Sequence, residues 1–262
     1  MIEPPDPATA AALARLYDLD LREDPGDIDL YRALADRADG PILELAVGSG
    51  RVAVPLARAG HTVTGVDLDT AMLGRARARA TEAGVPGERL ALHEADLVDV
   101  RLPDAGRYAF ALLALNSLIV LSDRDAQRAA LRTLAAHLAP GGIAAVDVWL
   151  PDADDLGRYD GRVILEWIRP DPTTGALVTK TGSAVHDAAT GTIVLTSMFD
   201  EARQGEPPTR WIRQDRLRLV SADELSEFAE GAGLRVELLA GGYDLGDFGP
   251  GAERAVLVAE RT

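Results

Sequence analysis

The chain contains no cysteine, and Lys180 is its only lysine. The missing cysteines exclude disulfides, thiolate metal sites and a cysteine nucleophile. The sequence also lacks an apolar run long enough to span a membrane, so we expect no membrane-spanning segment. Basic residues are scarce, with 27 Lys and Arg against 42 Asp and Glu, and the formal net charge is -15. A charge of this sign repels phosphate backbones, so we also expect no nucleic-acid partner.

The N-terminal segment MIEPPDPATAAALARLYD is acidic and contains several prolines. A secretory signal peptide is instead basic and then apolar. Together with the missing cysteines, which fit a reducing compartment, this segment predicts a cytoplasmic protein. The length of 262 residues, of which 47% are hydrophobic, suits one α/β domain with one insertion.

The segment from Pro41 to Asp69 has the pattern of a nucleotide-binding half-fold. The apolar run Ile42 to Val47 predicts a short buried strand, and Gly48 and Gly50 allow a sharp turn that approaches a ligand closely. Helix-forming residues follow, and a second predicted strand ends just before Asp67. A carboxylate at that position can accept the hydroxyl protons of a ribose.

Two classes of cofactor use this geometry. Gly48, Gly50 and Ala53 fit the GxGxxA pattern of dinucleotide-binding folds, so an NAD(P)-dependent oxidoreductase is one alternative. Such an enzyme needs a proton donor such as a YxxxK pair, and no tyrosine lies four residues before Lys180. The glycines alone do not separate the two classes, so the residues around them have to decide.

Glu44 precedes the glycines in ELAVGSG, Asp96 follows the third predicted strand in HEADL, and LAPGG leads into the apolar segment IAAVDVWL. Together with Asp67, this set resembles the class I S-adenosylmethionine (SAM) methyltransferases. The resemblance covers roughly residues 10 to 150 and continues more loosely to the end of the chain. In that family one acidic residue opens the first motif, a second binds ribose and a third faces the adenine amine.

The resemblance implies roles at the carboxyl ends of the strands, where ligands of parallel sheets bind. Backbone amides near Gly48 to Arg51, at a helix N-terminus, would hold the methionine carboxylate. Asp67 would accept the ribose hydroxyls, and Met72 would pack on adenine, with ordinary helix packing as the alternative. Asp96 and the Leu97 amide would contact the adenine edge. The full set of expected cofactor contacts is Tyr17, Glu44, Ala46, Gly48, Gly50, Arg51, Asp67, Leu68, Met72, Asp96, Leu97, Leu115 and Asn116.

Two members of this set have structural alternatives. Asn116 lies among apolar neighbours in ALLALNSLIVL and must be hydrogen-bonded, either to cap the loop that follows or near the cofactor or acceptor. Tyr17, like Tyr31, resembles tyrosines in the N-terminal cap of small-molecule methyltransferases that close over the cofactor. The alternative for both tyrosines is packing of a helix onto the sheet.

Alternating strands and helices predict an α/β fold with a doubly wound, Rossmann-like seven-stranded sheet. Residues 1–150 are expected to form an N-terminal helical cap and the SAM-binding core. Residues 151–218, with DAATG as a turn, are expected to form an antiparallel β insertion that acts as a lid, and residues 219–262 complete the sheet. The predicted helices are 8–17, 27–38, 52–59, 70–83 with Thr70 as N-cap, 123–138 and 222–232; the predicted strands are 42–47, 61–66, 89–93, 108–115, 143–149, 235–239 and 254–260.

Methyl transfer needs little chemistry from a protein, because the sulfonium is already activated and positioning can supply roughly 7 to 11 kcal/mol. The candidate bases are Asp147 and His186, with loop capping and strand pairing as their alternatives. No convincing set of metal ligands is present, so we expect a metal-independent reaction. Aromatic residues after the core predict either an acceptor pocket or the core of the β layer: Trp149, Tyr159, Trp167, Phe199, Trp211 and Tyr243.

The sequence therefore predicts a SAM-dependent methyltransferase that acts on an N or O atom of a small-molecule acceptor, in natural-product metabolism. The chain is similar to bacterial amino-sugar N,N-dimethyltransferases, although its acceptor contacts are not carried by a motif and C transfer stays open. We expect a monomer or a homodimer. A SAM-binding protein without transferase activity is a second alternative, because binding motifs survive the loss of catalysis.

Overall fold

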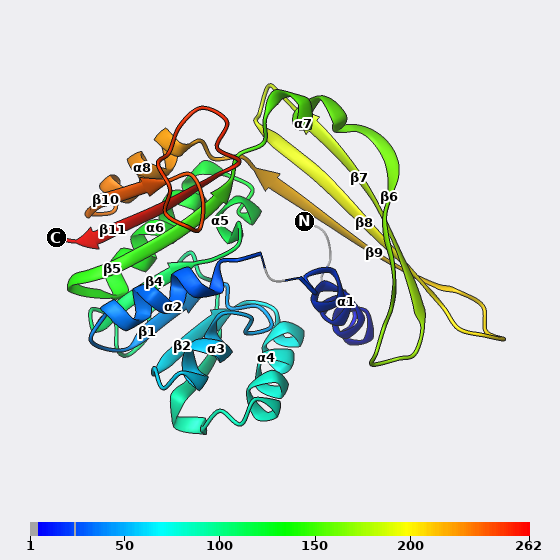
Figure 1. The fold of residues 1–262 in the computed structure, drawn as a ribbon, viewed down its shortest axis with the longest axis horizontal. Helices are drawn as coiled ribbons and strands as arrows, with labels where there is room; N and C mark the ends of the chain where they lie inside the picture. Colours follow the sequence, from blue (N-terminus) through cyan, green and yellow to red (C-terminus); the bar gives the residue numbers. More distant parts are fainter. Residues whose placement is uncertain (1–4, 24) are drawn as a thin grey trace.

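A computed structural model describes residues 5–23 and 25–262 of the chain. Figure 1 shows a large sheet covered by helices, a second sheet at one end of the molecule, and helix α1 between them. The predicted α/β fold with an antiparallel insertion is thereby confirmed. None of the described helices is long and apolar enough to cross a membrane.

The large sheet has seven strands in the order β10-β11-β5-β4-β1-β2-β3. Adjacent strands in the part β5-β4-β1-β2-β3 are parallel, while β11 is antiparallel to both of its neighbours, β5 and β10. The order runs outward in two directions from the adjacent pair β1 and β4, and ligands bind at such a switch point in open α/β sheets. The strands are β1 (Ile42–Leu45), β2 (Val63–Asp67), β3 (Leu90–Glu94), β4 (Tyr108–Leu113), β5 (Leu138–Trp149), β10 (Leu234–Ala240) and β11 (Arg254–Arg261).

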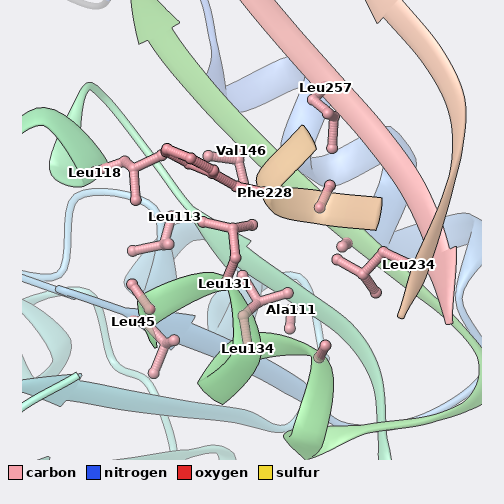
Figure 2. Packing of buried hydrophobic residues seen from close by; sticks show 14 of the residues in the cluster. Leu45, Ala111, Leu113, Leu118, Leu131, Leu134, Val146, Phe228, Leu234 and Leu257 are labelled. Carbon is pink, nitrogen blue, oxygen red and sulfur yellow. The ribbon is translucent and has the colours of Figure 1, made fainter. Parts of the chain in front are cut away.

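Both faces of this sheet are buried, each by its own helices. One apolar cluster joins the sheet to α5 (Ser117–Val120), α6 (Arg124–His137) and α8 (Ala222–Gly231). Figure 2 shows Leu131 and Phe228 of two of these helices facing Leu113 and Val146 of the strands. A second cluster on the opposite face contains residues of α2 (Ile28–Arg37), α3 (Ala53–Arg58) and α4 (Thr70–Glu82). A short 3-10 helix, η1 (Gly87–Arg89), precedes β3.

The second sheet is the predicted antiparallel insertion, with the strand order β6-β7-β8-β9. It follows the short helix α7 (Ala153–Arg158), which the sequence analysis missed. Asp187 to Gly191 form the predicted turn between the second and third strands. The strands are β6 (Asp160–Pro170), β7 (Leu177–Asp187), β8 (Thr192–Ala202) and β9 (Thr209–Arg218).

Helix α1 (Pro7–Asp20) is capped by Asp6, whose carboxylate accepts hydrogen bonds from the amides of Ala8 and Thr9. Its apolar residues Leu16 and Leu19 pack on the second sheet, together with Val178 and Phe199. Its other side contacts α4 of the core. The helix therefore lies between the second sheet and α4 of the core (Figure 1).

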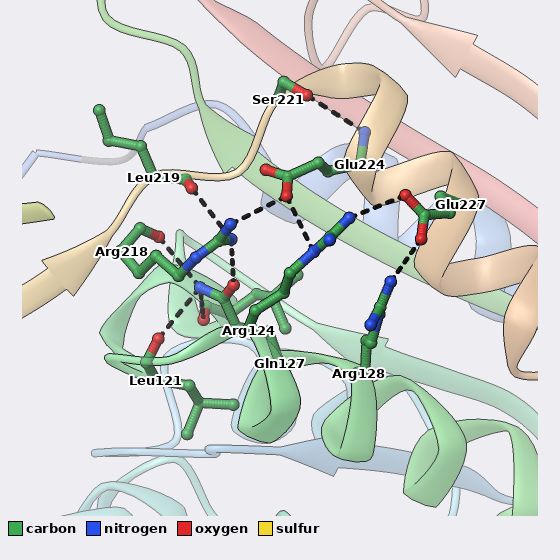
Figure 3. A network of polar contacts seen from close by, with 10 residues as sticks. Leu121, Arg124, Gln127, Arg128, Arg218, Leu219, Ser221, Glu224 and Glu227 are labelled. Atoms are coloured by element: carbon green, nitrogen blue, oxygen red, sulfur yellow. Dashed lines mark hydrogen bonds and ion pairs between the residues drawn. The ribbon is translucent and has the colours of Figure 1, made fainter. Parts of the chain in front are cut away.

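A polar network fixes the return of the chain from the second sheet to the core (Figure 3). Arg218, at the end of β9, donates to the Gln127 Oε1 at 2.8 Å and pairs with Glu224 of α8 at 2.9 Å. The Gln127 amide nitrogen donates to the carbonyls of Leu121 and Arg218, both at 3.0 Å. Gln127 is buried, so these bonds satisfy its amide and hold the end of β9 against α6.

Several element boundaries differ from the sequence prediction. The prediction that Thr70 caps α4 is wrong, because Asp69 is the N-cap and accepts from the amides of Ala71 and Met72. The predicted Ser221 cap of α8 is confirmed by its bond to the Glu224 amide. Strand β5 begins at Leu138, so LAPGG is part of the strand rather than a loop before it.

Candidate active site

The carboxyl ends of β1 and β2 bring the glycine loop and Asp67 together. Gly48 and Gly50 have φ of 53° and 75°, the left-handed region that favours glycine. A side chain at Gly50 would also lie 3.0 Å from Val54 and 3.1 Å from Ala76, so the loop can lie this close to α3 and α4 only with glycine there. Ala46 has a φ of 56° without being glycine, and such strain in a non-glycine residue clusters at functional sites.

Asp67 closes this loop from the end of β2. One carboxylate oxygen accepts from the Gly48 amide at 2.7 Å, and the other accepts from the Asp69 amide at 2.9 Å. Burial raises the pKa of the Asp67 carboxyl, while these two amide bonds lower it. Each carboxylate oxygen has a second lone pair, so Asp67 can still accept a hydrogen bond from a ligand hydroxyl.

Glu44 lies one strand away, at 3% exposure. Burial raises the pKa of its carboxyl to about 8, although Arg51 opposes the shift by attraction. Its Oε2 has no hydrogen-bond partner within the described part of the chain. A buried carboxylate oxygen without a donor is costly, so this atom is suited to receive an N–H donor or a cation from a ligand.

Arg51 and Asp27 form an ion pair that sequence reasoning missed. The two guanidinium nitrogens lie 2.6 and 2.5 Å from the two carboxylate oxygens of Asp27, which is fully buried. This bidentate geometry fixes the guanidinium plane. Asp27 is the N-cap residue of α2, and its carboxylate bonds to Arg51 instead of capping the helix. Nothing in the local sequence near Asp27 indicates a partner in the glycine loop.

Helix α1 reaches the same loop through Tyr17 and Asp18. Asp18 accepts from the Ser49 hydroxyl at 2.5 Å and from Arg75 and Arg79 of α4 at 2.5 and 3.1 Å. Burial raises the pKa of Tyr17, and the positive charge of Arg51 is the largest effect that opposes this shift. The guanidinium of Arg213, on β9, lies 5.8 Å from the Tyr17 ring centre. Tyr17 is therefore placed between the core and the second sheet, whereas Asp18 had not been singled out.

The expected adenine contacts occupy the ends of β2 and β3. Met72 is buried in the first turn of α4, while the large apolar side chain of Leu68 is 67% exposed. Asp96 is exposed and accepts from the Val98 amide at 2.9 Å within its own loop. Leu97 packs partly against the apolar core. These roles stay predictions. Leu68 and Met72 follow the end of β2, and Asp96 and Leu97 follow the end of the neighbouring strand β3.

Leu115 and Asn116 follow β4 in a strained turn, with φ of 49° and 65°. The Asn116 Oδ1 accepts from the Trp149 amide at 2.6 Å and from Arg254 at 3.2 Å. The side chain therefore ties the β4 turn to the end of β5, rather than capping the loop that follows it. The alternative that Asn116 caps the following loop is therefore wrong, while its place near the cofactor or acceptor stays a prediction.

Asp147 is the centre of the most buried polar network at this edge. It is fully buried and accepts from the Tyr31 hydroxyl at 2.5 Å, the Leu115 amide at 2.7 Å, the Tyr243 hydroxyl at 3.0 Å and Arg254. Because the carboxylate is fully buried and its donors all belong to the protein, it has no free path to an acceptor. The geometry favours the loop-positioning alternative for Asp147, and likewise the packing alternative for Tyr31, which is 0% exposed.

His186 lies on β7, paired in register with Ile193 of β8. Its backbone amide bonds to the Tyr159 carbonyl at 3.0 Å, and no bond of its ring is found in the described residues. The strand-pairing alternative describes this position. Lys180 pairs with Asp20 at 2.6 Å and Glu166 at 2.7 Å, so it takes part in the contact between α1 and the second sheet.

The aromatic residues after the core do not form one cluster. Trp167, Phe199 and Trp211 pack against α1, whereas Trp149 lies 6.2 Å from Tyr159 before the second sheet. Tyr243 belongs to the Asp147 network. The prediction of a single aromatic acceptor pocket is not supported by this arrangement, and the three residues under α1 form the core of the β layer.

Comparisons with known proteins agree with this geometry. Residues 42–142 match the model of a methyltransferase domain family. No curated protein matches the chain. The structure of the CcbJ methyltransferase from Streptomyces caelestis is 23% identical, with a TM-score of 0.73 over 92% of this chain and 98% of that one.

Two further solved structures share the fold over nearly their whole length. A SAM-dependent methyltransferase from Clostridium acetobutylicum is 16% identical, with a TM-score of 0.78 over 95% of this chain and 98% of that one. The sugar N-methyltransferase KedS8 from Streptoalloteichus is 21% identical, with a TM-score of 0.73 over 94% and 92% of the two chains. The match places a methyltransferase domain over the glycine loop and the ends of β1 to β4. The solved structures share their fold with nearly the whole of this chain.

Proposed function

We propose that this chain transfers a methyl group from SAM to a nitrogen or oxygen atom of a small-molecule acceptor. The observation that carries the cofactor assignment is the arrangement of Glu44, Gly48 and Asp67 at adjoining strand ends. SAM supplies a methyl group on an activated sulfonium. The residues of the chain bind and orient it.

The donor and acceptor groups at this edge fit SAM. The partnerless Oε2 of buried Glu44 suits the positively charged amino-acid end of the cofactor. Asp67 has acceptor capacity for ribose hydroxyls beyond its two amide bonds. The predominance of acidic groups here also favours a cationic ligand over a dinucleotide phosphate.

The second sheet supports the assignment of an acceptor site between β9 and the core. Arg213 on β9 forms an ion pair with Asp215 at 2.8 Å and lies over Tyr17. Burial lowers the pKa of Arg213, but the hydrogen bond and negative charge of Asp215 raise it by more, and Asp69 at the start of α4 adds to this increase. A sheet in this place excludes water from the reaction and contributes polar groups to the acceptor.

The class of acceptor rests on the neighbours of the fold and on the site. KedS8 is described as a sugar N-methyltransferase, and CalS10 from Micromonospora echinaspora as an amino pentose methyltransferase. An amine acceptor needs only to lose a proton before attack, which suits a site whose two candidate bases are not placed for catalysis. We therefore favour an amine of a small molecule, such as an amino sugar, over a hydroxyl.

The cofactor site is tested by titrating SAM into the protein in a calorimeter. Asp67→Asn keeps an oxygen for the Gly48 amide but removes the charge, and we expect it to weaken SAM binding by about 1.5 to 3 kcal/mol, the usual scale for hydrogen bonds to a charged group. Asp99→Asn, at an exposed position in the loop after β3, is the matched control and should bind SAM normally. An unchanged dissociation constant in folded Asp67→Asn would show that Asp67 does not hold the ribose.

The transfer itself is tested with a panel of amino sugars and their hydroxyl counterparts, with S-adenosylhomocysteine release as the readout. We expect turnover with amines and little or none with the matched hydroxyl compounds. Turnover confined to hydroxyl compounds would overturn the choice of nitrogen. Normal SAM binding without any turnover across the panel would instead favour a binding protein without transferase activity.

A further inference from the structure

An arginine-lined cavity lies outside the edge where the cofactor is proposed to bind. Its volume is about 670 Å³, and it is bounded by α2, α3, the end of α4 and the segment after α1. The arginines that line it are Arg22, Arg32, Arg51, Arg58 and Arg79. Such a concentration of positive charge is unexpected in a chain with a formal net charge of -15.

The positive charge of this cavity is only partly neutralised. Arg51 pairs with Asp27, and Arg79 pairs with Asp18. Arg22, Arg32 and Arg58 have no acidic partner within residues 5–23 and 25–262, and no acidic side chain of those residues lines the cavity. Since a guanidinium does not lose its proton in proteins, the excess positive charge persists at every pH at which the protein is folded.

The cavity also has apolar walls. Leu21, Ile28, Val54 and Pro55 line it alongside the arginines. The volume is within the usual range for small-molecule sites, and a few charged groups among apolar side chains are typical of them. Arginine binds phosphate through two parallel N–H donors, while its planar face packs on flat apolar groups.

We propose that this cavity binds an organic phosphate, a small molecule with a phosphate dianion and an apolar part. The phosphate lies among Arg22, Arg32 and Arg58, whose guanidinium groups have no acidic partner in the described residues. The apolar part packs against Ile28 and Pro55. The site is separate from the SAM site at the carboxyl edge of the sheet, and the two share only the side chain of Arg51. The proposal does not depend on the methyl acceptor.

The test compares phenyl phosphate with inorganic phosphate by calorimetry at pH 8 and low salt, without SAM. At this pH both probes are largely dianions, because the second phosphate pKa is about 6. We expect phenyl phosphate to bind at least fivefold more tightly, because only it contacts the apolar walls. Affinity should fall as salt is added, since ions screen the attraction between exposed charges.

The site is located with a triple variant, Arg22→Gln, Arg32→Gln and Arg58→Gln. All three side chains are exposed, so the fold should persist, which circular dichroism checks. The matched control is Arg77→Gln, Arg101→Gln and Arg132→Gln, which removes the same charge from exposed positions outside the cavity.

We expect the cavity variant to lose at least tenfold in affinity for phenyl phosphate, and the control to change by less than twofold. Equal losses in both variants would show binding by net charge alone and overturn the site. The absence of millimolar binding to the unmodified protein would overturn it as well. Equal affinities for phenyl phosphate and inorganic phosphate would overturn the proposal that the ligand has an apolar part. Because SAM is absent from every titration, these outcomes are independent of the proposed cofactor.

Discussion

The two sheets of this protein are stabilised in different ways. All four residues of β1 in the large sheet are buried, whereas β6 in the second sheet is exposed along almost its whole length, with only Trp167 and Arg169 partly shielded. The large sheet has an apolar cluster on each face. The second sheet has one small cluster, which depends on α1.

This difference indicates that the position of the second sheet rests on a few contacts. Trp167 donates to Asp20 at 2.8 Å, Lys180 pairs with the same carboxylate, and Arg169 donates to the Leu19 carbonyl at 2.9 Å. Regions with few buried apolar contacts open at lower free energy than the core. We therefore expect the second sheet and α1 to open together while the large sheet stays folded.

The strongest test of the core is Asp147→Ala. It leaves Arg254, Tyr31, Tyr243 and the Leu115 amide without their shared acceptor. Removing one partner of a buried pair costs about 3–5 kcal/mol, so the free energy of unfolding in urea should fall by that amount.

The control for this variant is Asp99→Ala, at an exposed carboxylate, which should change the free energy of unfolding by no more than about 0.5 kcal/mol. If Asp147→Ala is as stable as Asp99→Ala, the network at the end of β5 does not stabilise the core.

Glu44→Gln should change how the stability of the core depends on pH. Burial raises the pKa of Glu44 from 4.5 to about 8, so between these values the folded state holds a proton that the unfolded state has released. The contribution of Glu44 to stability therefore falls as pH rises, by roughly 2–3 kcal/mol between pH 5 and pH 7. The glutamine variant should lack this fall, as measured by urea unfolding at several pH values.

Glu94→Gln is the control for this measurement, because Glu94 is an exposed glutamate at the end of β3 in the same sheet. It should keep the pH dependence of the unmodified protein. If the free energy of unfolding changes with pH in the same way in the unmodified protein, Glu44→Gln and Glu94→Gln, Glu44 is ionised in the folded state.

The smallest expected effect concerns the second sheet. Trp167→Phe keeps an aromatic ring near Phe199 but removes the indole N–H that bonds to Asp20. A hydrogen bond of this kind contributes about 1.5–3 kcal/mol when its acceptor is charged, less where solvent reaches it, so we expect a loss of about 1 kcal/mol. In hydrogen exchange, the amides of α1 and β6 should then exchange several times faster, while those of β1 and β4 stay unchanged.

Trp149→Phe is the matched control, since Trp149 also packs beside an aromatic ring but its indole N–H has no partner in the described structure. It should leave exchange in α1 unchanged. Faster exchange throughout the large sheet in Trp167→Phe would contradict the separation between the two sheets.

The sequence was sufficient to predict the features that follow from local patterns. The buried strand at Ile42, the glycine turn, the Ser221 cap and the DAATG turn each depend on residues within a few positions of one another. The sequence also predicts that Asp67 lies at a strand end beside the glycine loop, and the structure places its carboxylate against the Gly48 amide. Its contact with ribose stays a prediction.

The features that were missed depend on partners far apart in the chain. Asp18 bonds to Ser49, and Asp27 to Arg51, but in the sequence both are ordinary acidic residues near helix ends. The position of Asp147 at a strand end suggests a base, but its burial depends on donors such as Tyr31 and Arg254, each more than a hundred positions away in the chain. The aromatic residues were grouped by their closeness in sequence, although three of them pack on α1.

The position of α1 makes the unit that carries the second sheet discontinuous in sequence. Asp18 ties the helix to Ser49 and α4, and Asp20 ties it to Trp167 and Lys180. A chimaera that takes residues 159–218 from a homologous enzyme would keep the native α1 beside strands of the other enzyme. It would then lose the contacts of Asp20 with Trp167 and Lys180. Recombination between such enzymes should therefore succeed only when α1 and the β strands come from the same parent, which makes the first helix part of the exchangeable module.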